Sequence, residues 1–137
     1  MKIDTRLFGE IEINEESIIY FKEGIPGFEN YSRFVILDIE EGSMKCLQSI
    51  ENKTLCLILI NPFDYFKDYQ INLSDNEIDK LKISKEEDVF IFNVLNIKDD
   101  KITANMVAPI VVNVINNLGM QIILQDSNYS IRQEIKC

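Results

Sequence analysis

The stretch DVFIFNVLNIKDDKITANMVAPIVVNVI, residues 88–115, decides the fold. It holds three apolar runs, DVFIFNVLNI, KITANMVA and PIVVNVI, and the turn-forming pair Asp99-Asp100 lies between the first two. Short runs of valine, isoleucine and phenylalanine that are bounded by turn residues are typical of β-strands. We therefore expect three consecutive strands in this part of the chain.

The rest of the chain repeats the pattern over 137 residues, the length of one domain. The run at 9–14 alternates isoleucine with polar residues, as a half-buried strand does. Runs of the same kind are MKIDTRLF (1–8), GEIEIN (9–14), SIIYF (17–21), RFVILDI (33–39), MKCLQSI (44–50), LCLILIN (55–61), YQINL (69–73) and MQIILQ (120–125). This spacing predicts an all-β fold, a small antiparallel β-barrel or sandwich of short strands that forms one domain over residues 1–137.

One short helix is predicted at about Asp75–Leu81, within LSDNEIDKLKI. Ser74 is a favourable N-cap, and Glu77 follows three residues later, so each side chain can accept a hydrogen bond from the backbone N–H of the other. Ile78 and Leu81 share one face of this helix and are expected to pack on the sheet.

Two of the predicted strands, at 55–60 and 89–95, are apolar on both faces. Such a strand in an antiparallel sheet needs cover on both sides. The barrel interior covers one face, and the other face is covered by the helix, by a loop or by another protein. We expect the cover to come from the same chain.

The segment EGIPGFE, residues 23–29, is rich in turn-forming residues. Pro26 fixes its own φ angle, while Gly24 and Gly27 accept positive φ without steric cost. These residues predict a defined corner between two strands, in which Phe28 turns inward as a plug. On this reading Gly24, Pro26, Gly27 and Phe28 have a structural role.

The charge balance is strongly acidic, with 23 acidic and 14 basic residues and a net charge of −9. Such a field repels phosphate backbones, so we expect no direct binding of nucleic acid. It leaves open the attraction of a basic protein. The start of the chain, MKIDTRLFGEIEI, lacks the apolar core of a signal peptide, and no apolar run approaches the ~20 residues that cross a bilayer. We expect a cytoplasmic protein without a membrane partner.

The chain contains no histidine, which removes the usual general base and the commonest transition-metal ligand. It also lacks a Gly-rich phosphate loop and a G-x-S-x-G elbow. We expect neither an enzyme nor a cofactor or metal site. Two alternatives remain open on composition: an adaptor or scaffold in bacterial signalling, and a carboxylate-dependent hydrolase, which requires two acidic side chains that converge in a cleft.

The cysteines Cys46, Cys56 and Cys137 are odd in number and form no C-x-x-C pair. Cys46 and Cys56 lie in apolar strand runs, where we expect reduced thiols that act as small hydrophobic side chains. We expect Cys137 to be an exposed residue of the tail.

Three blocks of the chain, in this order, resemble the FliW family of flagellar assembly factors. They are YFKEGIPGFENYSRF (20–34), LQSIENKTLCLILINPFDYFKDYQI (47–71) and ITANMVAPIVVNVINNLGMQIIL (102–124), and the likeness runs from about Phe8 to Tyr129. Three ordered blocks are a more specific signal than the Gly-Ile-Pro-Gly turn alone.

The resemblance implies a small, cytoplasmic, β-barrel-like protein that is not an enzyme. Members of this family bind newly made flagellin and, when free of it, bind the RNA-binding translational repressor CsrA. That capture relieves the repression of flagellin synthesis by a route that does not compete with RNA. The implied partners are therefore flagellin and CsrA, and we expect a monomer.

The block NPFDYFKDY, residues 61–69, supplies the candidate partner-binding residues. It mixes aromatic and acidic side chains, as the central residues of protein interfaces do. The candidates are Phe63, Asp64, Tyr65, Asp68 and Tyr69. A loop that packs on its own barrel explains the aromatic residues as well, and both readings stay open.

Three further residues of TANMVAPIVVN, residues 103–113, are expected to have structural roles. Asn105 and Asn113 are suited to satisfy backbone groups at strand ends. Pro109, which has no N–H, is expected at a sheet edge or a bulge.

Overall fold

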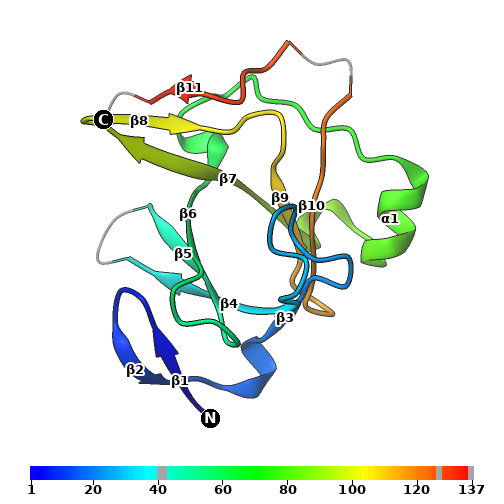
Figure 1. Cartoon of the computed structure of the whole chain (residues 1–137). Coiled ribbons are helices and arrows are strands. Elements are labelled where there is room, and N and C mark those ends of the chain that lie inside the picture. Colours follow the sequence, from blue (N-terminus) through cyan, green and yellow to red (C-terminus); the bar gives the residue numbers. More distant parts are fainter. Residues whose placement is uncertain (40–42, 126–127, 136–137) are drawn as a thin grey trace.

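The computed structural model describes residues 1–39, 43–125 and 128–135, and seven of its strands close into a barrel (Figure 1). In ring order they are β7 (Val89–Lys98), β6 (Cys56–Ile60), β5 (Lys45–Ser49), β4 (Arg33–Asp38), β3 (Ile19–Tyr20), β10 (Leu118–Gln121) and β9 (Ile110–Asn113). The ring closes where β9 pairs with the first half of β7. All these neighbours are antiparallel except β3 and β10, which run parallel at Tyr20 and Leu118. The prediction of an all-β barrel or sandwich is confirmed, and the structure is a barrel.

The remaining strands lie at the two ends of the barrel. The hairpin of β1 (Lys2–Thr5) and β2 (Gly9–Glu12) lies at one end, while β8 (Lys101–Ala104) and β11 (Gln133–Glu134) lie at the other (Figure 1). β8 and β11 extend the second half of β7 beyond the closed ring. Short 3-10 helices occupy Glu15–Ser17, Pro62–Asp64 and Glu86–Asp88.

Two apolar clusters cover the two faces of β6 and β7. The first fills the barrel interior and includes Phe21, Phe34, Leu47, Leu59, Phe92 and Ile110. The second lies outside the ring and includes Ile60, Leu95, Tyr69, Met106 and Ile135. Most of both doubly apolar strands is therefore covered from within the chain, as predicted, but Phe90 near the start of β7 is 52% exposed.

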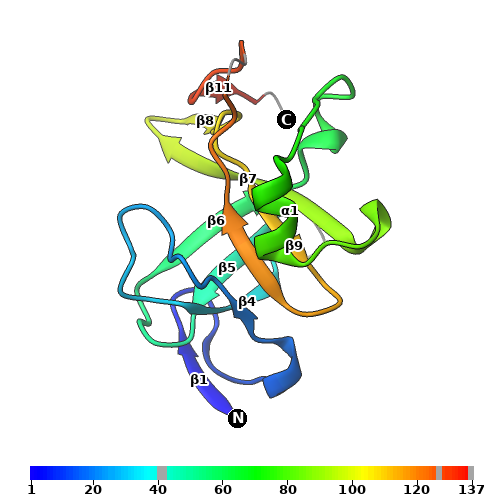
Figure 2. The same ribbon diagram turned by 90° about the vertical axis from the view of Figure 1, so that its right-hand side faces the viewer.

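The helix α1 (Asp75–Leu81) forms over the residues that the sequence predicts. The Ser74 side chain accepts a hydrogen bond from Glu77 N–H at 3.1 Å, and the Glu77 carboxylate accepts one from Ser74 N–H at 2.8 Å. Figure 2 shows the helix beside β9 and β10, where Leu81 is buried and Ile78 is half-buried. The predicted capping box is confirmed, and so is the packing of Leu81 on the sheet. Ile78 instead lines the outer groove that also includes Phe63.

The turn at 23–29 is the predicted corner, but its plug is a different residue. Gly24 and Gly27 have φ angles of +71° and +89°. Ile25 is buried in the barrel interior, whereas Phe28 is 39% exposed. The prediction that Phe28 turns inward is wrong, because the two left-handed glycines direct Ile25 to the core, while the following Pro26 and Phe28 line an outer groove.

The cysteines also differ from the prediction. Cys46 in β5 and Cys56 in β6 are joined in a disulfide, so the expectation of two reduced thiols is wrong. They lie on neighbouring strands, where Cys46 is opposite Ile58 and Cys56 is opposite Gln48, and this cross-strand register brings the two side chains together. Cys137 lies outside the described residues.

The two asparagines have the roles that the sequence predicts, and Pro109 partly differs. Asn105 Oδ1 accepts from the N–H groups of Val107 and Ala108, and Asn113 Nδ2 donates to the last carbonyl group of α1, at Leu81. Pro109 comes directly before β9, which is paired on both sides, so the sheet-edge alternative is wrong. At that place no ladder hydrogen bond requires its missing N–H.

One predicted strand does not form. Residues 69–73, YQINL, are extended but join no sheet, and the run predicted at 120–125 leaves β10 after Gln121. Within the described ranges, none of the helices has the length and apolarity that crossing a membrane requires.

A candidate protein-binding surface beside residues 61–74

The segment 61–74 runs between β6 and α1 and carries all five candidate residues. Asn61 starts it by accepting a hydrogen bond from Phe63 N–H at 3.0 Å, and Pro62 occupies the first turn of the 3-10 helix. Ser74 ends it as the N-cap of α1. Both ends of the segment are therefore anchored by caps that the local sequence encodes.

The middle of the segment is held on the barrel by Tyr69, which is 4% exposed. Its hydroxyl donates to the carbonyl oxygen of Met106 at 2.6 Å and lies 3.3 Å from Asn93 Nδ2, which donates to it. Its ring meets that of Tyr129 edge to face, with 4.7 Å between the centroids. Burial raises the pKa of Tyr69 above its usual value; the hydrogen bond from Asn93 acts in the opposite direction, and Tyr129 adds to the increase.

The other four candidate residues lie on the outside. Phe63 is 42% exposed, Asp64 and Asp68 are exposed, and Tyr65 is half-buried. Tyr65, Asp68 and Tyr69 line one groove of about 410 Å³, whereas Phe63 lines another of about 560 Å³ on the far side of the segment. The structure thus brings Tyr65, Asp68 and Tyr69 to one groove. Phe63 lines the other groove, although its ring lies near that of Tyr69, with 6.1 Å between the centroids. Tyr69 lies beneath the surface as a support.

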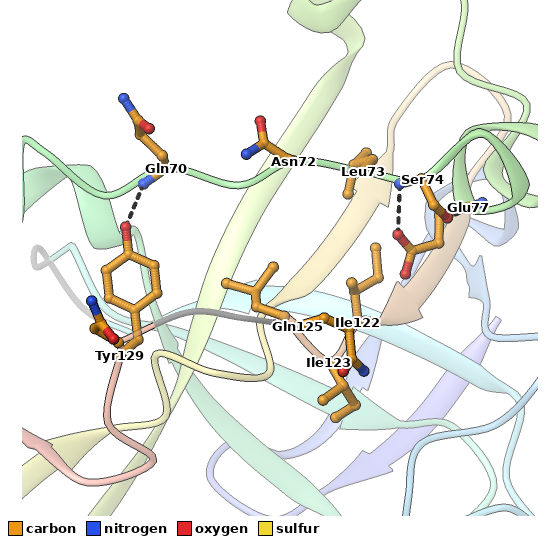
Figure 3. A pocket seen from close by; sticks show the side chains of 11 residues that line it. Gln70, Asn72, Leu73, Ser74, Glu77, Ile122, Ile123, Gln125 and Tyr129 are labelled. Carbon is orange, nitrogen blue, oxygen red and sulfur yellow. Dashed lines mark hydrogen bonds between the residues drawn. The ribbon is translucent and has the colours of Figure 1, made fainter.

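A third and larger groove, of about 710 Å³, lies between residues 70–74 and residues 122–125 (Figure 3). Tyr129 spans it at one end, where its hydroxyl accepts from Gln70 N–H at 2.9 Å. Glu77 marks the other end through its bond to Ser74 N–H. Sequence reasoning missed this groove, although the strand-like alternation of Tyr69, Ile71 and Leu73 was a signal that the segment is extended.

The charges around segment 61–74 are mostly negative. Between residues 61 and 81 the acidic residues are Asp64, Asp68, Asp75, Glu77 and Asp79, and the basic residues are Lys67 and Lys80. Among the described residues, Glu77 is the only charged residue that lines the large groove, and its carboxylate is occupied by the helix cap. The surface therefore combines acidic side chains with partly apolar grooves, a combination that suits the binding of polypeptides.

The comparison with known proteins identifies the family. The model of the FliW protein family matches residues 2–135. The chain belongs to the FliW family. The flagellar assembly factor FliW of Geobacillus thermodenitrificans is 43% identical over 137 residues, which cover 98% of this chain and 95% of that protein. The flagellar assembly factor FliW of Clostridium novyi is 43% identical over 138 residues, with coverages of 98% and 96%.

A solved structure supports the same conclusion. The crystal structure of a flagellar assembly factor FliW matches this chain with a TM-score of 0.93 and 42% identity, and the match covers 98% of this chain and 96% of the other. The barrel described above is therefore a FliW fold. Membership of the FliW family gives the chain the role of a flagellar assembly factor.

Proposed function

We propose that this FliW protein is a cytoplasmic, monomeric, non-enzymatic factor that binds newly made flagellin and, when free of it, binds CsrA. Capture of CsrA lifts its repression of flagellin translation, so that flagellin synthesis follows assembly. The observation that carries the proposal is the FliW match over residues 2–135.

The charge of the protein supports the CsrA part of this proposal. A repressor that binds RNA presents a basic surface. A protein of net charge −9 is attracted to that surface but repelled by the RNA itself. Binding beside the RNA path lowers RNA affinity tenfold through a coupling free energy of about 1.4 kcal/mol. A few carboxylates near the phosphate path suffice for a coupling of this size.

We propose that a partner binds at the surface beside residues 61–74. Phe63, Asp64, Tyr65 and Asp68 are the contacts we propose there, and Tyr69 positions them from below. We assign the acidic pair Asp64 and Asp68 to the basic partner, because both side chains are exposed and lie on one capped segment.

Co-purification from a flagellated bacterium tests the proposal. Flagellin and CsrA should both be recovered with the protein, in separate complexes. The double substitution Asp64→Asn and Asp68→Asn should weaken the recovery of CsrA. The control is Asp99→Asn with Asp100→Asn, which removes the same charge from the β7–β8 turn, where both residues have positive φ angles that asparagine tolerates. Absence of both partners at micromolar protein would contradict the proposed function.

A further inference from the structure

The disulfide between Cys46 and Cys56 is a feature that the proposed function does not explain. Cys46 lies in β5 and Cys56 in β6, ten residues apart in the sequence. For the cytoplasmic location of the protein we rely on the proposed function. Disulfides in cytoplasmic proteins are usually transient bonds with a catalytic or redox-sensing role. A bond of that kind must open and close while the protein stays folded.

The strand pairing holds the two cysteines near each other without the bond. Four residue pairs join β5 to β6, from Lys45 opposite Leu59 to Gln48 opposite Cys56. With this register the Cα atoms of the two cysteines are 6.1 Å apart, which lies within the usual range for disulfides. Two reduced thiols at these positions therefore stay in place for the bond to form again.

The turn between the two strands is also held by other bonds. Ser49 Oγ accepts hydrogen bonds from the N–H groups of Glu51 and Asn52, each at 3.0 Å. Gln48 Nε2 donates to the carbonyl oxygen of Lys53 at 3.1 Å. None of these bonds involves a cysteine. We therefore expect the reduced protein to keep this turn and the barrel around it.

The two cysteines differ in their exposure to solvent. Cys46 is 0% exposed, whereas Cys56 is half-buried. In the described sheet, Cys46 has a paired strand on both sides. Cys56 has one on a single side, because β6 pairs with β7 only in its last two residues. A dissolved thiol reacts with a sulfur atom that it can reach, so its reaction with this disulfide starts at Cys56.

We propose that Cys46 and Cys56 form a reversible redox site, which a small intracellular thiol opens and the disulfide form of that thiol closes. A thiolate of the small thiol attacks Cys56 Sγ and forms a mixed disulfide with it. The electron pair of the broken bond leaves with Cys46 Sγ, which takes up a proton.

A second thiolate completes the reduction. It attacks the sulfur atom of the small thiol in the mixed disulfide and releases Cys56 Sγ, which also takes up a proton. Two electrons have then passed to the two cysteines, and the small thiol leaves as its own disulfide. Oxidation of the site follows the same steps in reverse.

The redox site adjoins the sheet on which segment 61–74 packs. Ile58 lies opposite Cys46 and belongs to the second apolar cluster, as do Tyr65 and Phe66 of the segment. A closed disulfide stabilises a protein because it restrains the unfolded chain. The redox state of the site should therefore set the stability of the barrel that carries the candidate surface.

Cycles of reduction and oxidation of the purified full-length protein test the proposal, with glutathione as the probe. Excess reduced glutathione should open the bond and glutathione disulfide should close it, as counted by alkylation of free thiols and mass spectrometry. The reduced protein should still unfold cooperatively, with a Tm about 5–10 °C below that of the oxidised protein.

Three results of these cycles would each overturn the proposal. They are a bond that stays closed in excess reduced glutathione, thiols that glutathione disulfide does not oxidise, and a reduced protein that is unfolded. Neither flagellin nor CsrA enters this experiment, so its failure leaves the proposed partners untouched.

Single-cysteine variants test the point of attack, with Cys137→Ser in every protein so that the third thiol does not react. Cys46→Ser leaves Cys56 alone and should form a mixed disulfide when glutathione disulfide is added. Cys56→Ser leaves the buried Cys46 alone and should react at least about tenfold more slowly. Equal rates overturn the attack at Cys56. If either variant fails to fold, the cycles in the protein with Cys137→Ser alone decide.

Discussion

The Tyr69 hydroxyl donates a 2.6 Å hydrogen bond to the carbonyl oxygen of Met106, 37 residues along the chain. This bond ties segment 61–74 to the connection between β8 and β9. It also fixes the position of Tyr129, whose ring packs on Tyr69 and whose hydroxyl closes one end of the large groove. The geometry of the whole candidate surface therefore depends on one buried tyrosine.

Replacing this tyrosine by phenylalanine should destabilise the fold. Tyr69→Phe keeps the ring but leaves the Met106 carbonyl group and Asn93 Nδ2 without the hydroxyl. We expect the free energy of unfolding, measured with urea, to fall by about 1–3 kcal/mol. Tyr65→Phe is the control, because the Tyr65 hydroxyl has only a 3.5 Å contact with Ser43 in an exposed place. Equal effects of the two substitutions would contradict the role given to Tyr69.

The same residue should produce a pH dependence of stability. Burial raises the pKa of Tyr69 above its usual 10.0. Below the usual pKa, Tyr69 is protonated in the folded and in the unfolded protein, so its contribution to the free energy of unfolding is constant. Above the usual pKa, Tyr69 ionises in the unfolded protein first, and the free energy of unfolding falls until the pH passes the pKa of the folded state. Urea unfolding between about pH 9 and pH 11 should therefore show a steeper loss for the unmodified protein than for Tyr69→Phe.

The two glycines of the turn at 23–29 differ in the space beside them, and alanine substitutions test the effect of that difference on stability. Gly24 and Gly27 both have positive φ, but a Cβ on Gly24 would lie 2.7 Å from the Glu29 Cα atom, while one on Gly27 would meet nothing within 4 Å. Gly27→Ala should cost about 1 kcal/mol of strain. Gly24→Ala should cost at least about 1 kcal/mol more, because backbone must move to make room. Thermal unfolding of both variants checks this order, which equal losses would contradict.

The local parts of this structure could be predicted from the sequence. The helix over Asp75–Leu81 and its Ser74–Glu77 capping box formed as expected, because the residues that decide them are within a few positions of one another. The positive φ angles of Gly24 and Gly27 could also be predicted from neighbouring residues alone. The barrel followed from the repeated strand pattern.

The parts that depend on distant contacts could not be predicted. Whether Ile25 or Phe28 enters the core depends on the packing of the whole barrel, and the Cys46–Cys56 disulfide depends on the register of β5 and β6. Residues 69–73 have a strand pattern, but a β-strand forms only beside a second strand with which it can hydrogen-bond. The sequence does not show that these residues lack such a neighbour. Of the candidate site, the sequence found segment 61–69 and missed the groove behind it.

The charge of the protein predicts different salt responses for its two proposed partners. If the exposed carboxylates steer the capture of CsrA, the association rate should fall at least about tenfold between about 0.01 M and 1 M salt, where the screening length falls from about 30 Å to about 3 Å. Flagellin binding should change less if it uses the large groove, because the described residues that line the large groove include no free charge. Stopped-flow measurement of both rates checks this difference. An equal response would remove the electrostatic part of the argument.

The most direct measurement is a titration of purified flagellin into a preformed complex of this protein with CsrA, followed by size-exclusion chromatography with light scattering. The account predicts that CsrA is released as the flagellin complex forms, with one flagellin bound for each CsrA set free. A stable complex of all three proteins, or a CsrA complex that flagellin leaves unchanged, would contradict it.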